Sequence, residues 1–226
     1  MTRAIVFDTE TTGLEPHLGH RVIEVAAVEL KNDLPTGRQF HCLIDPRRDV
    51  PEDATRIHGF TNAHLAGKPL FGEIAGELLE FLGADEVMIA HNAPFDFAFL
   101  NAELETLGLP QLASGRMVDT LELAKTKFPG LPNSLDALCR RFAIDLSART
   151  THNALLDCKL LAEVYIELTG GRQRGLALET RAVSASAIVY EVDRARVPRP
   201  IMPSEEELAA HAALVARLKD PVWAAG

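Results

Sequence analysis

The feature that most constrains the fold is the stretch RAIVFDTETTG, which runs from Arg3 to Gly13. It begins as an apolar, β-branched run typical of a buried strand, and then places Asp8 and Glu10 where that run should continue. Side chains alternate between the two faces of a strand, so both acids share the face of Val6 if the strand continues through residue 10. Two neighbouring carboxylates at the end of an interior strand are unfavourable unless positive charge lies between them. The fold must therefore bring a counter-charge to this strand.

The pattern that follows predicts a layered α/β or α+β protein with a mixed sheet. Residues 21–30 and 39–44 read as strands joined by a turn at residues 31–37, and residues 87–90 as a short buried strand. Thr61 can cap a short helix, and Gly83 can end an amphipathic helix that begins near residue 72. Four more helices are predicted, at residues 94–107, 120–127, 134–142 and 153–168.

Two further acids fall on helix faces that should be buried. Asp96 lies on the same stripe as Leu100, and Asp157 lies on the same stripe as Leu161. Acids on helices normally occupy the solvent-facing side, so an inward acid needs a cation, a hydrogen-bond network or a raised pKa. The sequence therefore holds four carboxylates that are unexpected where they are predicted to lie.

A pair of divalent cations would explain all four acids together. The charges of four carboxylates and two such ions cancel, and all-oxygen ligands select Mg²⁺ or Mn²⁺ over Zn²⁺. Two ions about 3.5–4 Å apart can stabilise the attacking and leaving oxygens of a phosphodiester. The alternative is four unrelated capping acids, which requires four separate coincidences.

His152 is the candidate base of such a site. It precedes Asp157 by five residues, which is about 140° around an ideal helix, so the two cannot share one helical stripe. We therefore expect His152 on the turn that enters the helix, with Thr150 or Thr151 near the cap. An imidazole exchanges a proton near neutral pH and could accept one from an attacking water.

Three motifs resemble those of the DnaQ-like, DEDDh family of 3′-to-5′ exonucleases. They are DTETTG with Asp8 and Glu10, HNAPFD with Asp96, and HNALLD with His152 and Asp157. The resemblance covers residues 3–168 and implies a ribonuclease-H-like fold, with a five-stranded mixed sheet flanked by helices and the acid-bearing strand at its centre. It also implies two Mg²⁺ or Mn²⁺ ions, held by the four acids, with His152 as the base.

The resemblance extends to the branch of the family that proofreads for bacterial replicative polymerases. RIHGFT at residues 56–61 and RTTHNALLDCKLLAEVYIELTGG from residue 149 are similar to that branch. The likeness implies that His58 and an acid at Glu52 or Asp53 lie near the terminal nucleotide. It also implies that the backbone at Thr11 and Gly13 holds the sugar of that nucleotide.

The amino-acid composition changes in the C-terminal quarter of the chain, and the new pattern predicts a linker followed by one helix. Residues 169–203 are basic near their start and rich in proline near their end, which is typical of a flexible linker. Residues 204–226 open with Ser204 and Glu207, a capping-box pair. Within the linker, residues 173–178 resemble the Q-x-x-L-x-F peptide that binds sliding clamps, although a leucine replaces the usual aromatic. The peptide residues that match are Gln173, Leu176 and Leu178.

Besides single-stranded DNA 3′ ends, these features imply two partners: a polymerase alpha subunit bound by the C-terminal helix, and a sliding clamp. The sequence leaves open whether a small theta-like subunit also binds. The net charge of −9 and pI near 5.4 exclude a broad basic surface for nucleic acid, so partner proteins must supply most of the contacts with DNA. Three dispersed cysteines and the lack of a signal-peptide pattern predict a bacterial cytoplasmic protein without a membrane span.

Two other hypotheses remain open at this stage. One keeps the chemistry and changes the substrate, as in an RNA-trimming relative similar to RNase T or oligoribonuclease. The linker and C-terminal helix count against it, because those relatives resemble residues 1–168 only. The other is a non-catalytic assembly module, and the complete set of acids with His152 counts against it.

Overall fold

The computed structural model describes residues 2–149, 151–170, 200 and 202–219. The chain divides into two compact units, residues 1–177 and 178–226. No helix among the described residues is long and apolar enough to cross a membrane.

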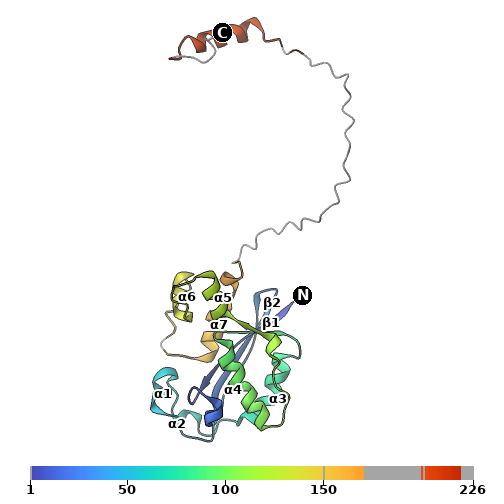
Figure 1. Cartoon of the computed structure of the whole chain (residues 1–226), viewed down its shortest axis with the longest axis vertical. Helices are drawn as coiled ribbons and strands as arrows, with labels where there is room; N and C mark the ends of the chain where they lie inside the picture. Colours follow the sequence, from blue (N-terminus) through green and yellow to red (C-terminus); the bar gives the residue numbers. More distant parts are fainter. Residues whose placement is uncertain (1, 150, 171–199, 201, 220–226) are drawn as a thin grey trace, which may run out of the picture. The chain divides into compact units, whose positions relative to one another are not determined.

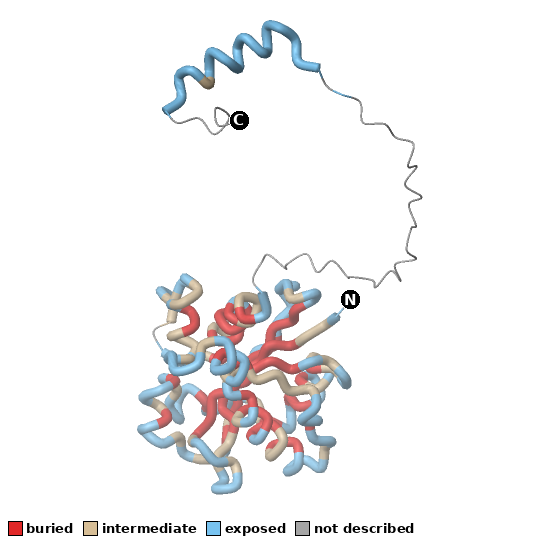
Figure 2. Tube along the Cα trace, turned by 45° about the horizontal axis from the view of Figure 1, so that its top comes forward, coloured by how far each residue is buried: buried red, intermediate tan, exposed pale blue. Residues whose placement is uncertain are grey.

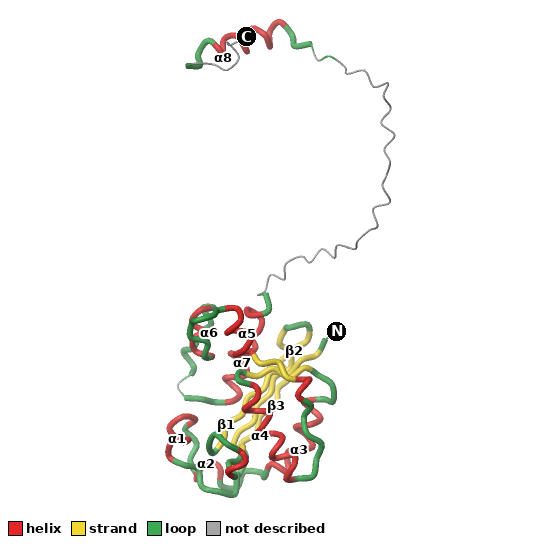
Figure 3. Tube along the Cα trace, viewed as in Figure 1, coloured by secondary structure: helices red, strands yellow, loops and turns green. Residues whose placement is uncertain are grey.

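The first unit is built on the five-stranded mixed sheet that the family resemblance implied (Figures 1 and 3). The strand order is β3-β2-β1-β4-β5, with β2 antiparallel to β1 and β3, and with β4 parallel to β1 and β5. Because β1, β4 and β5 are parallel, their carboxyl ends meet at one edge of the sheet, where this class of sheet binds ligands. The strands are β1 (Arg3–Thr11), β2 (Val22–Lys31), β3 (Leu34–Leu43), β4 (Val87–Ala90) and β5 (Met117–Asp119).

Helices cover both faces of the sheet and bury its interior (Figures 1 and 2). Ile5 and Phe7 of β1 pack on one face with α3 and α4, whereas Val6 packs on the other face with α5, α6 and α7. The alternation follows from the two-residue period of a strand. The helices on the two faces are α3 (Phe71–Leu82), α4 (Ala93–Thr106), α5 (Thr120–Lys127), α6 (Leu135–Arg141) and α7 (Ala154–Leu168).

Four short helices complete the described chain of the first unit. They are η1 (Pro16–Leu18), α1 (Glu52–His58), α2 (Asn62–Leu65) and η2 (Ser114–Arg116). The sequence pattern predicted α2 with its Thr61 cap but missed α1, which spans two turns only, and β5, which is three residues long.

The turn predicted at residues 31–37 is wrong in length. Only Asn32 and Asp33 connect β2 to β3, and both have positive φ, 52° and 62°, as a two-residue type I′ hairpin requires. Pro35 and Gly37 lie inside β3 and not in the turn, because β3 is an edge strand and tolerates a proline.

The second unit contains one described helix, α8 (Glu205–Val215). The predicted capping box is present, since Glu207 N donates to Ser204 Oγ at 3.2 Å and Ser204 N donates to Glu207 Oε2 at 2.8 Å. Leu208 and Leu214 are more than half exposed, at 54% and 57%. The clamp-like residues Gln173, Leu176 and Leu178 lie outside the described residues.

Candidate active site

Asp8 and Glu10 lie on one face of β1 because the strand does continue past residue 10, to Thr11. This is the face of Val6, which packs against α7. Glu10 is buried, with 8% of its surface exposed, and it lies directly opposite Glu24 of β2. The core strand of the sheet therefore ends in two carboxylates aimed toward α7.

Asp96 approaches the same strand end from α4, on the opposite face of the sheet. It accepts hydrogen bonds from the backbone N of Thr9 at 3.0 Å and from the Thr9 hydroxyl at 2.7 Å. Thr9 faces away from Asp8 and Glu10, so its hydroxyl points toward α4. Asn92, which precedes α4, adopts a left-handed φ of 68° that turns the chain sharply from β4 into the helix. Hydrogen bonds from Thr9 thus hold Asp96 against β1, on the face of the sheet opposite Asp8 and Glu10.

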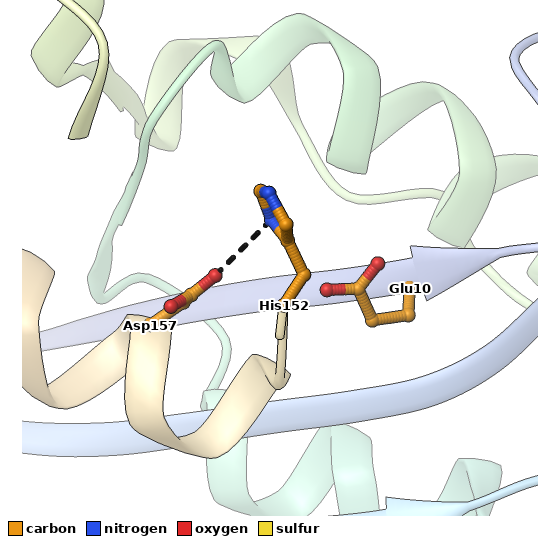
Figure 4. A group of neighbouring side chains, drawn as sticks. All are labelled: Glu10, His152 and Asp157. Atoms are coloured by element: carbon orange, nitrogen blue, oxygen red, sulfur yellow. Dashed lines mark ion pairs between the residues drawn. The ribbon is translucent and has the colours of Figure 1, made fainter. Parts of the chain in front are cut away.

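Asp157 and His152 come from the start of α7. Asn153 caps this helix by accepting from Leu156 N at 3.0 Å, so His152 lies on the turn before the cap, as its spacing predicted. The cap is Asn153 and not Thr151, and Thr150 lies outside the described residues. Figure 4 shows Glu10, His152 and Asp157 converging from β1 and the α7 entry, and one potential ligand atom from each lies within 4.8 Å of the others.

Arg149 is a site residue that the sequence analysis missed. Its guanidinium donates to both carboxylate oxygens of Asp157, at 2.6 and 2.8 Å, and to Nδ1 of His152 at 3.0 Å. It also donates to Asp136 of α6 at 2.8 Å. Its closeness to His152 in the chain was the only available signal, because nothing in the spacing identifies its partners.

Burial and mutual repulsion dominate the electrostatics of the acids. Burial, followed by the charges of Glu24 and Asp157, raises the pKa of Glu10 to about 8. Burial raises the pKa of Asp96 to about 7 in spite of the hydrogen bonds from Thr9. Burial and the charge of Asp96 also hold the pKa of Asp8 well above its ordinary value. Three of the four acids therefore experience uncompensated negative charge.

Asp157 behaves in the opposite way because it has a cationic partner. Burial alone would raise its pKa, but the hydrogen bonds and charge of Arg149 outweigh burial and keep the pKa of Asp157 below its ordinary value. Among the ion pairs of the described residues, none engages Asp8, Glu10 or Asp96. An all-oxygen donor set with this charge deficit fits a hard divalent cation such as Mg²⁺ or Mn²⁺.

A pocket of about 490 Å³ adjoins the acids on the side of Glu10. Its walls include the predicted substrate-binding positions Thr11, Gly13, Asp53 and His58. Glu52, the alternative to Asp53, is not among the residues that line this pocket. The apolar part of the wall is formed by Leu14, Leu18, Pro51, Ala54, Ile57 and Phe95.

His58 lines this pocket and has a buried ring nitrogen without a hydrogen-bond partner. The side chain is buried, and Nδ1 accepts from Phe60 N at 3.0 Å, so the ring proton resides on Nε2. Nε2 is the one buried side-chain nitrogen or oxygen in the described chain that lacks a hydrogen-bond partner. Because burial lowers the pKa of His58, the ring stays neutral and offers a single N–H to a ligand.

Asp119 and His91 support the site without entering the acid cluster. Asp119 Oδ1 caps α5 by accepting from Leu121 N, and it also accepts from Asn92 N, each at 2.9 Å. His91 Nδ1 lies 2.9 Å from the Thr120 hydroxyl. These contacts fix the loop between β4 and α4, and hence the helix start that carries Asp96.

The fold and the acid cluster together define a nuclease, and comparison with known proteins gives the family. The RNase_T family, described as Exonuclease, matches residues 5–165. The chain belongs to this exonuclease family.

The most informative relatives are proteins named DNA polymerase III subunit epsilon. The chain is 46% identical to the one from Rickettsia felis over 217 residues, covering 92% of this chain and 93% of that protein. It is 41% identical to the one from Escherichia coli K12 over 225 residues, covering 94% and 92%.

Solved structures of nucleases share the fold over about three quarters of the chain. Exonuclease X in complex with 5′ overhanging duplex DNA is 27% identical with a TM-score of 0.58, covering 75% of this chain and 91% of that one. The nuclease domain of 3′hExo, a DEDDh family member bound to rAMP, matches with a TM-score of 0.62 at 17% identity, over 74% and 91%. At that identity the second match supports the fold alone.

Proposed function

We propose that the chain removes nucleotides from the 3′ ends of DNA by hydrolysis, as the proofreading subunit of a bacterial DNA polymerase III. The observation that carries the chemistry is the convergence of Glu10, His152 and Asp157 within 4.8 Å at the end of the strand that also bears Asp8. The names of the relatives, which the chain matches over more than nine tenths of its length, support the polymerase assignment.

Asp8, Glu10, Asp96 and Asp157 would hold two Mg²⁺ or Mn²⁺ ions, which when bound supply positive charge opposite the phosphate and the leaving 3′ oxygen. The donor set is suited to this role because its members come from both faces of the sheet. Asp8 and Glu10 face α7, whereas Asp96 reaches the strand end from α4. A cluster assembled in this way can surround a ligand.

His152 supplies the proton transfer. Water attacks the phosphorus of the terminal phosphodiester and gives a proton to the imidazole. The bond from phosphorus to the 3′ oxygen of the preceding nucleotide breaks, and that oxygen takes up a proton from solvent to become the new 3′ hydroxyl. The product is a nucleoside 5′-monophosphate. Arg149 donates to Nδ1 of His152, which leaves the ring proton on Nε2, so the ring can accept a proton only after that hydrogen bond breaks. When that hydrogen bond breaks, the guanidinium of Arg149 can stay bound to Asp136, to which it already donates.

The apolar pocket beside Glu10 would receive the terminal nucleoside. Leu14, Ile57 and Phe95 offer apolar surface to the base, and the unpaired Nε2–H of His58 offers a donor to a sugar or phosphate oxygen. A pocket of this kind accepts one unstacked nucleotide. A mispaired end is less costly to unstack than a paired one, which gives the enzyme its selectivity for errors.

We also propose that the chain is organised for assembly, with residues 1–168 as the exonuclease domain, 169–203 as a linker that carries the clamp-binding peptide 173–178, and 204–226 as the tether to the polymerase alpha subunit. The exposed leucines of α8 support the last assignment, because a capped helix with exposed apolar side chains is suited to a partner groove.

The activity is tested with 5′-labelled single-stranded DNA and an RNA of the same sequence, in Mg²⁺ and in EDTA. We expect a ladder of DNA shortened from its 3′ end in Mg²⁺ only, with slower cleavage of RNA. Asp8→Ala should abolish the ladder, whereas Asp85→Ala, which alters an exposed acid far from the cluster, should leave it unchanged. Preferential cleavage of RNA would favour the RNA-trimming hypothesis, and no Mg²⁺-dependent release would favour an assembly module.

The assembly role is tested by capture of a purified polymerase alpha subunit on the full chain and on residues 1–168. We expect capture by the full chain only. A full chain in which Leu208 and Leu214 are changed to Asp keeps the length and removes two exposed leucines of α8. It should no longer capture the alpha subunit, while it keeps its exonuclease activity. Equal capture by both lengths of chain would contradict the role of the tail.

A further inference from the structure

Glu24 is a fully buried acid on β2 to which the proposed mechanism assigns no role. Its side chain has no exposed surface, and the basic side chain in contact with it is a histidine, His41 of β3, whose Nε2 lies 2.7 Å from Oε1 of Glu24. The other buried acids outside the cluster, Glu29 and Glu103, each have an arginine partner. A buried carboxylate is costly unless its oxygens are satisfied, so the partners of Glu24 indicate what it does.

Two further partners of Glu24 lie where α7 begins, next to the candidate base His152. Glu24 Oε2 accepts from the backbone N of Ala154 at 3.0 Å, and Oε1 accepts from the side-chain amide of Asn153 at 3.0 Å. Ala154 is the first residue of α7 and Asn153 is its cap. The negative charge of Glu24 therefore lies at the amino end of the helix, where the helix dipole also favours an anion.

The same side chain is in register with the acid-bearing strand. Glu24 is paired directly with Glu10 across β1 and β2, so the two side chains stand on the same face of the sheet. Glu24 thus connects the sheet beside Glu10 to the start of the helix that bears Asp157. His152 lies one residue before Asn153, and its own N donates to Ile57 O at 3.3 Å.

We propose that Glu24 is a positioning residue, which anchors the first turn of α7 to the sheet and thereby sets the places of His152 and Asp157 relative to Glu10. His41 completes the anchor by occupying the third hydrogen-bonding position of the carboxylate. The inference rests on the proposed function for its catalytic consequence, whereas the anchoring itself is a property of the metal-free chain.

The chain offers a matched control on the same strand. Glu29 is equally buried and lies five residues further along β2, but its partners are Arg3, Thr36 and Arg38 at the other end of the sheet. Glu24→Gln and Glu29→Gln each remove one buried charge from one strand. A general loss of stability should affect both variants, whereas a loss of positioning should affect only the first.

The test combines kinetics on single-stranded DNA with amide hydrogen exchange in EDTA. Glu24→Gln should lower kcat by about 10- to 100-fold, the usual cost of removing a group that orients the residues of a metal site, and should change KM by less than about threefold. Glu29→Gln should keep kcat within about twofold of the parent. Exchange at residues 154–157 should accelerate in Glu24→Gln and stay at the parental rate in Glu29→Gln.

Asn153→Ser provides a second variant if Glu24→Gln does not fold. Serine keeps the cap of α7 but lacks the amide that donates to Glu24, so kcat should fall severalfold with little change in melting temperature. Parental kcat in a folded Glu24→Gln or in Asn153→Ser, or unchanged exchange at residues 154–157, would overturn the proposal. Failure of the unaltered chain to release nucleotides would instead refute the proposed function, and the exchange data would still decide whether Glu24 anchors the helix.

Discussion

Replacing Glu10 by glutamine should stabilise the metal-free protein at alkaline pH while it abolishes activity. In the folded chain, burial and neighbouring charges raise the pKa of Glu10 from its ordinary 4.5 to about 8. Between these two values the folded state binds more protons than the unfolded state, so the free energy of unfolding falls as the pH rises. Glutamine is isosteric and cannot ionise, so it removes this loss.

The magnitude follows from the gap between the two pKa values. At about 1.4 kcal/mol for each pKa unit, ionising Glu10 in the folded state costs at most about 5 kcal/mol once the pH exceeds 8. The cost should shrink below about 1 kcal/mol at pH 5, where the unfolded glutamate is itself partly protonated. Even one fifth of the upper limit, about 1 kcal/mol, would raise the melting temperature by roughly 2–4 °C in a chain of this size.

The assay is urea unfolding in EDTA, followed by circular dichroism from pH 5 to pH 8.5. Glu10→Gln should unfold at a higher urea concentration than the parent at pH 8.5, and the two should converge at pH 5. Glu77→Gln, which changes an exposed acid on α3, should follow the parent throughout. Addition of Mg²⁺ should stabilise the parent more than Glu10→Gln. A Glu10→Gln chain that is less stable than the parent at pH 8.5, or a difference that does not depend on pH, would refute the reasoning.

Three further predictions concern single side chains of the site. His152→Ala should retain Mn²⁺ binding, measured by calorimetry, but lose about 10²- to 10⁴-fold in kcat at neutral pH, the usual contribution of a general base; an unchanged rate would remove His152 from that role. Arg149→Met frees both oxygens of Asp157, so Mn²⁺ should bind about tenfold more tightly, which corresponds to about 1.4 kcal/mol of lost competition; weaker binding would mean that Arg149 supports the cation site. His58→Ala deletes the unpaired Nε2–H and should raise KM about 5- to 10-fold with kcat nearly kept, as expected for one hydrogen bond to substrate; an unchanged KM would place the substrate elsewhere.

Much of the fold could be predicted from local pattern. The helix start at Ser204, the stop at Gly83 and the inward acids Asp96 and Asp157 follow from side-chain chemistry within a few residues, and the structure has each of them. The predictions that failed are also local but depend on backbone geometry. The sequence KNDLPTG reads as a long turn, yet two residues with positive φ suffice, and the rest of the segment joins an edge strand.

The candidate site, like the fold, could be predicted only in part from the sequence. The residue types of the site were predictable, because an acid in an apolar strand or stripe is unexpected wherever the chain folds. Their convergence was argued from charge, and the family resemblance supplied the expected roles. The pairing of Arg149 with Asp157 and of Glu24 with the start of α7 was not predictable, since neither pair has a sequence signature.

The sequence by itself therefore determined which side chains needed counter-charges and which elements carried them, because burial and periodicity are properties of neighbouring residues. Only the tertiary structure decided which groups meet those charges. Helices α4 and α7 pack on opposite faces of the sheet, and their starts meet at the end of β1, where Asp96 accepts hydrogen bonds from Thr9 and the start of α7 donates to Glu24. These contacts join residues that lie far apart in the chain, so they form only when the side chains of the core are closely packed.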